Sequence, residues 1–125
     1  MNNMIEFHPG DNSFVRIGSN AADNWEIIET LKRSDIWIHL KDAPSCHAMV
    51  RIPKKLRDND RSRMNILNRV AHMMCIQSAK RIPRNSDNVT FIYTNGKYVR
   101  KGFAPGEAIL SVTPDEFSVE NPQHM

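Results

Sequence analysis

The segment DIWIHLKDAPSCHAMVR, residues 35–51, has the alternating pattern of a β-hairpin and decides the fold that we expect. Aliphatic residues recur at every second position on both sides of KDAPSCH, which is the period of a half-buried strand. We predict a register in which facing residues have numbers that sum to 88. One face of this ribbon holds Ile36, Ile38, Leu40, Ala48, Val50 and Ile52. The other face holds the facing pairs Trp37 and Arg51, His39 and Met49, and Lys41 and His47. The segment therefore predicts an aliphatic core face and an aromatic, basic face.

The flanking sequence predicts two helices. In DNWEIIETLKR (23–33), Asp23 can cap a helix and Glu26 can complete a capping box. The polar stretch 54–63 predicts a mobile basic loop, after which Asp60 or Ser62 can cap a helix from 63 to 80. The second helix should bury a stripe formed by Leu67, Val70, Ala71, Met74, Cys75 and Ser78.

Strand patterns complete the fold prediction. SFVRIGSN (13–20) predicts a strand that enters a turn, and NVTFIYTN (88–95) predicts a strand followed by a hairpin turn at Asn95-Gly96 into KYVRK. AILSV (108–112) and DEFSV (115–119) predict two more strands, and 120–125 a frayed, flexible tail. Helices and strands do not alternate strictly, so we expect an α+β fold: a single compact domain, 1–125 with its core at about 14–119, built on a mainly antiparallel twisted sheet with two principal helices.

The positive charge of the chain is concentrated in its middle. Residues 51–101 contain 13 Lys or Arg and three Asp or Glu, a net charge of +10, although the whole chain carries only +3. The flanking segments are net acidic. Such a concentration is typical of a surface that binds a polyanion, most simply nucleic acid, although a solvated basic surface is the plain alternative.

Several classes of protein are not indicated. The sequence has neither a long apolar run nor a secretory signal, so we expect no membrane association. Two cysteines are too few for a disulfide scaffold, and no Cys/His spacing suggests zinc, so we expect a reduced, cytoplasmic protein without a metal. The glycines are isolated and lack the spacing of phosphate-binding or dinucleotide-binding loops, so we expect no cofactor.

Several separated motifs resemble the NFACT-R domain. DIWIHLKDAPSCHAMVR is similar to its signature: Asp-x-Trp, an aliphatic or aromatic residue, His, a spacer, Pro-Gly-Ser-His and a strand ending in Arg or Lys. FVRIGSNAADNWEIIETLKRS, ILNRVAHMMCIQSAKR and NVTFIYTNGKYVRKGFAPGEAILSV resemble the strand, helices and final strands around it. The resemblance covers about residues 14–119. Ser45 and Cys46 stand where the family usually has Gly and Ser, and 54–63 is longer and more basic.

The resemblance is to the stand-alone form of NFACT-R, without the N-terminal domain, helix-hairpin-helix segment and coiled coil of full-length NFACT proteins. It implies non-catalytic binding of RNA, with tRNA-like structures or ribosome-associated rRNA foremost, and the same charges would suit DNA. We do not carry over ribosome binding or tail synthesis. The predicted nucleic-acid-binding residues are Trp37, His39, Lys41, His47, Arg51, Lys97, Arg100 and Lys101.

Each of these predictions has an alternative. Trp37 would stack on a base, or it would fill a second core layer beneath a helix. His39 and His47 would hydrogen-bond a phosphate or base, bind a metal, or be structural. The lysines and arginines would contact phosphate, or serve solubility. Two other functions stay open: an RNA-processing or RNA-modification enzyme or subunit that uses His39 and His47 as acid and base, and a protein-interaction module.

Overall fold

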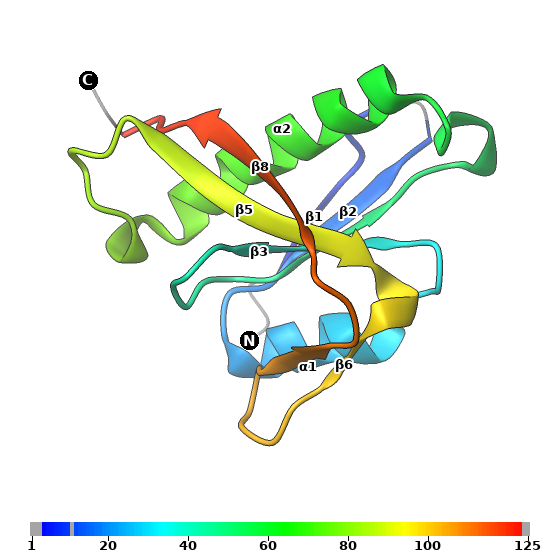
Figure 1. Cartoon of the computed structure of the whole chain (residues 1–125), viewed down its shortest axis with the longest axis horizontal. Helices are drawn as coiled ribbons and strands as arrows, with labels where there is room; N and C mark the ends of the chain where they lie inside the picture. The colour runs from blue at the N-terminus through cyan, green and yellow to red at the C-terminus, as the bar shows by residue number, and fades with distance from the viewer. Residues whose placement is uncertain (1–3, 11, 124–125) are drawn as a thin grey trace.

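A computed structural model of the chain describes residues 4–10 and 12–123, in which two α-helices enclose a six-stranded antiparallel sheet (Figure 1). The strands are β1 (Ile5–Phe7), β2 (Phe14–Ile17), β3 (Ile36–Leu40), β4 (Ala48–Arg51), β5 (Asn88–Asn95), β6 (Val99–Lys101), β7 (Ala108–Leu110) and β8 (Asp115–Glu120). The helices are α1 (Ala21–Thr30) and α2 (Asp60–Gln77), with short 3-10 turns η1 (Lys54–Leu56), η2 (Ala79–Arg81) and η3 (Gly96–Tyr98). The sheet order is β1-β2-β4-β3-β5-β8, and β6 pairs with β7 in a separate two-stranded sheet. The expected α+β class is confirmed.

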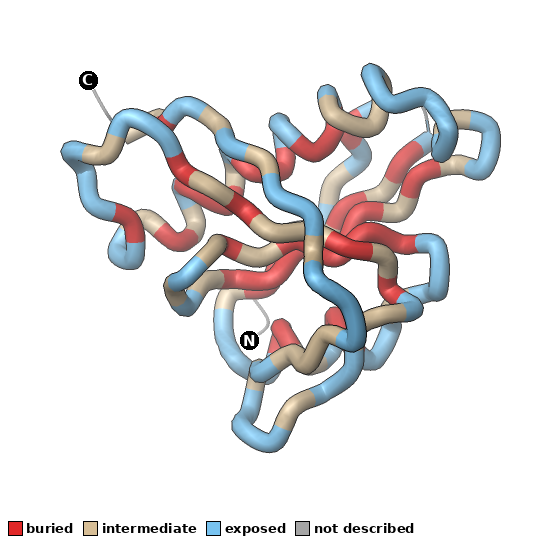
Figure 2. The backbone as a smooth tube through the Cα atoms, viewed as in Figure 1, coloured by how far each residue is buried: buried red, intermediate tan, exposed pale blue. Residues whose placement is uncertain are grey.

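The two faces of the sheet have different covers. α2 packs against the face that carries Ile36, Ile38 and Val50. Its buried stripe contains the predicted residues from Leu67 to Cys75 and also Ile66, whereas Ser78 is the C-cap after the helix. α1 and the β6–β7 hairpin lie on the opposite face, below the sheet in Figure 1. Figure 2 shows the buried residues concentrated in the central strands and on the inner sides of the helices, whereas β8 at the sheet edge is mostly exposed. The central strands β3 and β4 are therefore buried from both sides.

The predicted starts of both helices are corrected by about one turn. Asn20 caps α1, because its side chain accepts a hydrogen bond from Asp23 N at 2.8 Å. The Asp23 carboxylate instead accepts from Ser19 N and Ser19 Oγ. Asn59 caps α2 in the same way by accepting from Ser62 N at 3.0 Å, so part of the expected loop at 54–63 is helical. In each case an asparagine placed before the expected cap takes the capping role.

The register of the β3–β4 hairpin is also corrected. Ile36 pairs with Val50, Trp37 with Met49 and Ile38 with Ala48, so the numbers of facing residues sum to 86 rather than 88. A shift of two residues keeps every side chain on its predicted face but changes its partner. A side chain holds the loop between the two strands, because Ser45 Oγ accepts a hydrogen bond from Leu40 N at 3.1 Å.

Two predictions for the C-terminal part of the chain are also corrected, and one strand near the N-terminus was not predicted. Asn95-Gly96 is not a hairpin turn: Gly96 N donates to Asp35 O at 2.7 Å, and the chain leaves the main sheet to form β6. β1, which the sequence analysis did not predict, extends the core beyond residue 14. The tail is not frayed at its start, because the buried Asn121 side chain donates to Pro83 O and Ser86 O. Residues 124–125 lie outside the described residues.

The buried carboxylate of Asp35 connects α1, β3 and β4. Asp35 is 1% exposed, and Arg51 donates to it twice, from Nε at 2.9 Å and from a terminal nitrogen at 2.8 Å. Lys32 N also donates to this carboxylate. The hydrogen bonds that the Arg51 guanidinium donates to Asp35 raise the pKa of Arg51. Asp35 therefore connects the end of α1, the start of β3 and the end of β4.

We predict that Arg51→Ala lowers the free energy of unfolding by about 2–3 kcal/mol, because it leaves the Asp35 carboxylate buried without its cation. Urea denaturation at pH 7 measures the change. Arg84→Ala, at an exposed position, is the control and should change stability by less than about 0.5 kcal/mol. Equal effects of the two substitutions would contradict a structural role for the ion pair.

Candidate nucleic-acid interface

Three aromatic rings from the β3–β4 hairpin meet on the sheet face opposite α2. Trp37 and His39 are nearly parallel, with an interplanar angle of 11° and ring centroids 5.6 Å apart. His47 contacts both at their edges, with its centroid 4.8 Å from that of His39. The corrected register explains the contact, because residues 39 and 47 fall at the same level when facing numbers sum to 86.

The rings do not form an open platform. Trp37 is 2% exposed and His47 is 3% exposed, because α1 and the β6–β7 hairpin lie over this part of the sheet. The predicted stacking of a base directly on Trp37 is therefore corrected: the indole belongs to a second core layer. His39 is only half-buried and remains accessible.

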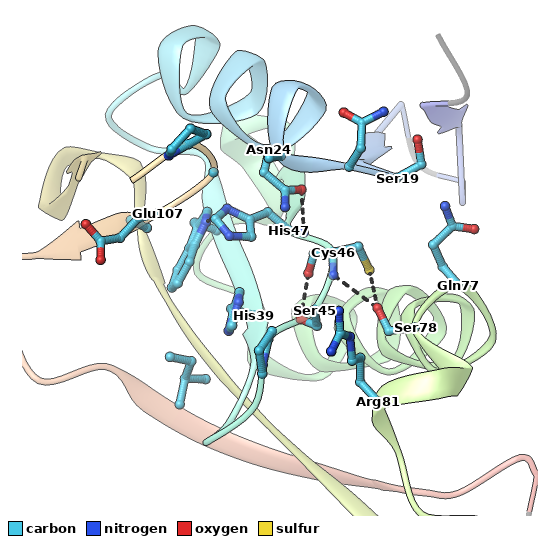
Figure 3. A pocket seen from close by; sticks show the side chains of 18 of the residues that line it. Ser19, Asn24, His39, Ser45, Cys46, His47, Gln77, Ser78, Arg81 and Glu107 are labelled. Carbon is cyan, nitrogen blue, oxygen red and sulfur yellow. Dashed lines mark hydrogen bonds between the residues drawn. The ribbon is translucent and has the colours of Figure 1, made fainter. Parts of the chain in front are cut away.

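A cavity of about 1000 Å³ lies beside these rings (Figure 3). Trp37, His39 and His47 contribute to its floor, with Ile92 from β5. Its walls come from residues 19–21 and 24 at the start of α1, residues 76–81 at the end of α2 and in η2, and residues 104–108 at the tip of the β6–β7 hairpin. Segments that are distant in the sequence thus converge on the hairpin signature.

The hydrogen bonds of the two imidazoles define which nitrogen of each neutral ring carries the proton. Trp37 Nε1 donates to His47 Nδ1 at 3.2 Å, so the hydrogen of His47 is on Nε2. His39 Nδ1 lies 2.7 Å from Leu40 O, and a carbonyl oxygen only accepts, so Nδ1 of His39 carries its hydrogen. His39 Nε2 is therefore an acceptor and His47 Nε2 a donor.

Both imidazoles are held in the neutral form. Burial, together with a smaller effect of the nearby His39 ring, lowers the pKa of His47 to about 3. Burial also lowers the pKa of His39, partly offset by its hydrogen bond to Leu40 O. At neutral pH the cavity floor therefore offers uncharged hydrogen-bonding groups.

The loop before β4 is fixed from both helices. Asn24 of α1 accepts from His47 N at 3.0 Å, and Ser78 at the end of α2 accepts from Cys46 N at 3.0 Å (Figure 3). Burial raises the pKa of the Cys46 thiol, and this thiol accepts a hydrogen bond from Ser78 Oγ. Cys46 therefore serves the wall of the cavity and is a poor nucleophile.

Most of the predicted phosphate contacts are engaged elsewhere. Lys41 pairs with Glu116 at 3.0 Å, and the pairing raises the pKa of Lys41. Lys101 Nζ lies 2.7 Å from Glu29 and over the Trp25 ring, which ties β6 to α1. Arg51 is bound to Asp35, and Lys97 lies over the ring of its neighbour Tyr98. Arg100 of β6 is exposed, as are Lys97 and Lys101, and it forms no salt bridge among the described residues.

The cations that line the cavity were not among the predicted site residues. Lys80 and Arg81, in η2, are exposed at its wall and form no salt bridge within residues 4–10 and 12–123. Figure 3 shows Arg81 on one side of the imidazoles and Glu107 on the other. The sequence signal for these cations was the basic segment AKRIPR immediately after the second helix. Sequence reasoning also missed Phe103, which is 95% exposed near the hairpin tip.

The described part of the chain offers neither a metal site nor a membrane-spanning helix. No group of three or more His, Cys, Asp or Glu side chains there could hold a metal ion. No helix among those residues is long and apolar enough to cross a membrane.

Comparison with known proteins identifies the fold alone. No protein-family model matches the sequence, and no curated protein matches it. The structure is similar to that of the C-terminal part of the fibronectin/fibrinogen-binding protein from Streptococcus suis, with a TM-score of 0.70 and 19% sequence identity. The match covers 94% of this chain and 44% of the other. The similarity supports the α+β architecture and carries no residue roles.

The buried histidines predict that the protein loses stability in mild acid. The unfolded chain protonates its histidines near pH 6.5, whereas folded His47 does so only near pH 3, so the free energy of unfolding falls as the pH drops between these values. His47 alone should contribute a loss of about 2 kcal/mol between about pH 6 and pH 4.5. His47→Gln should reduce this pH dependence in urea denaturation, whereas His72→Gln, at an exposed position of α2, should not. Equal pH dependence in all three proteins would contradict the neutral burial of His47.

Proposed function

We propose that the chain is a non-catalytic RNA-binding module of the NFACT-R type, which binds tRNA-like or ribosomal RNA. The observation that carries the proposal is a cavity with a neutral, polar floor and, at its wall, two cations that have no salt bridge among the described residues. Phosphate oxygens would bind Lys80 and Arg81, and the neutral rings would accommodate the uncharged parts of the RNA. The resemblance of residues 14–119 to NFACT-R supports the same function.

The β6–β7 hairpin offers a second set of contacts. Lys101 faces α1, so the adjacent Arg100 lies on the outer side of the hairpin. Phe103 is almost fully exposed next to Ala104 and Pro105, which line the cavity. Exposed aromatic rings beside cations are typical of single-strand-binding surfaces, because every base has a face that can stack. Phe103 thus takes the stacking role that we first assigned to Trp37.

The chemistry of the histidines favours binding over catalysis. A general acid or base is most effective when its pKa lies near the operating pH. Burial places the pKa of His47 at about 3, and its Nδ1 already accepts from Trp37. We therefore favour a non-catalytic role over the enzyme alternative.

Protein binding is the other alternative. The structural neighbour is described as a fibronectin/fibrinogen-binding protein, but at 19% identity we carry none of its ligands over. The absence of salt-bridge partners for Lys80 and Arg81 in the described structure favours a polyanion. Capture of a protein partner that persists after nuclease treatment would favour the alternative.

Removing the cations at the cavity wall should weaken RNA binding and its dependence on salt. We expect the double variant Lys80→Ala, Arg81→Ala to bind RNA about ten-fold more weakly at low salt, and to reduce the slope of log K against log salt by about 1.5. Lys54→Ala, Lys55→Ala removes the same charge at the opposite end of α2 (Figure 1) and is the matched control. Fluorescence anisotropy with a labelled RNA hairpin at several salt concentrations measures both quantities. An equal loss in both variants would assign binding to net charge and contradict this site.

Loss of the exposed ring should weaken RNA binding without affecting the fold. We expect Phe103→Ala to lower affinity for single-stranded RNA by about 5-fold to 100-fold, the range for one stacked base. Its free energy of unfolding should stay within about 0.5 kcal/mol of the original, because the ring buries almost no surface. Val112→Ala, another exposed apolar position, is the control. Unchanged affinity of the Phe103 variant would refute the stacking role.

A further inference from the structure

We propose, on the basis of the RNA-binding function above, that the cavity receives one unpaired nucleobase, which His39 and His47 hydrogen-bond while Lys80 and Arg81 hold its phosphate. The protein would thus select RNA that has a base free to leave its helix. Three features of the cavity support this selection: its size, the ring nitrogens on its floor and the separation of charge around it.

The cavity has the size and lining for a base. Its volume of about 1000 Å³ is at the upper end for small-molecule sites, which leaves room for a nucleotide but not for a duplex. Ile76, Ile92 and Leu110 contribute apolar surface to its lining. Such surface suits the flat faces of a base, whose polar atoms lie at its edge.

The two imidazoles present a donor next to an acceptor. His39 Nε2 accepts and His47 Nε2 donates, and the ring centroids are 4.8 Å apart. The Watson–Crick edge of each RNA base also has a donor beside an acceptor. A base-paired nucleotide already uses that edge, so only an unpaired one can offer it to the protein.

The half-buried His39 ring can also extend an existing stack. One face of His39 lies nearly parallel to Trp37, at 11° and 5.6 Å, and the ring is partly exposed to the cavity. A base on its other face would continue the series of parallel rings. In this arrangement Trp37 supports His39 from beneath and does not itself touch the RNA.

The charges around the cavity orient the nucleotide. The neutral imidazoles offer no charge to attract phosphate to the floor. Glu107, on one side, would repel phosphate, whereas Arg81 lies on the other side (Figure 3). The phosphate therefore lies toward η2, with the base extending inward over His39.

Two RNA hairpins that differ by a single bulged nucleotide test the inference. We expect the original protein to bind the bulged hairpin about ten-fold more tightly than the fully paired one at equal salt. His39→Phe keeps a ring against Trp37 but removes the acceptor, so its preference for the bulged hairpin over the paired one should fall to about two-fold or less. His72→Phe, at an exposed position of α2, is the control and should keep the full preference.

A second measurement uses the unmodified protein and does not depend on the folding of a variant. In protein labelled with nitrogen-15 at histidine, the Nε2 resonance of His39 should shift with the bulged hairpin and not with the paired one. RNA binding without preference for the bulge, or without that shift, would overturn the base pocket and leave the proposed function standing. Failure to bind either hairpin would overturn both.

Discussion

The structure depends on the unequal covering of the two faces of one sheet. Six strands at a spacing of about 4.8 Å make a sheet about 24 Å wide. The 18 residues of α2 form a helix about 27 Å long, sufficient to span one face. The 10 residues of α1 reach only about 15 Å, and the β6–β7 hairpin extends that cover only in part. The cavity lies beside α1, over the part of this sheet face that α1 and the hairpin do not cover.

The partial cover of this sheet face also explains the chemistry of the cavity floor. Trp37 and His47 lie where α1 and the hairpin exclude water, so the indole N–H needs a partner and the His47 ring supplies it at 3.2 Å. The same burial keeps both imidazoles neutral and leaves charge to the exposed Lys80 and Arg81. The floor of the cavity is therefore neutral because it is buried, and the wall is cationic because its lysine and arginine are exposed to solvent. Asp35 and Arg51 secure the opposite end of the hairpin, which fixes its register.

The fold could be predicted further than the site because its signals are local. Alternation along 35–51 correctly placed Trp37, His39 and His47 on one face. Five of the six residues predicted for the buried stripe are buried in α2, whereas Ile66 was missed and Ser78 is the C-cap that follows the helix. The register was wrong by two because that shift leaves the same faces in place, so alternation does not detect it. Asp35 with Arg51, and His39 with His47, become neighbours only in the observed register. The caps were misplaced because Asn20, Asp23, Asn59 and Asp60 all have side chains suited to capping.

By itself the sequence determined the α+β class, the order of the main strands and helices, and the concentration of positive charge in 51–101, because each is recorded in short-range periodicity or composition. It also placed the three rings on one face of the hairpin, although not in contact with one another. Only the tertiary structure decided that Trp37 is buried, that Lys41, Arg51 and Lys101 are taken up by carboxylates, and that Lys80 and Arg81 stand at the cavity. Burial and ion pairing depend on which distant segments come together, and no local pattern in the chain specifies that.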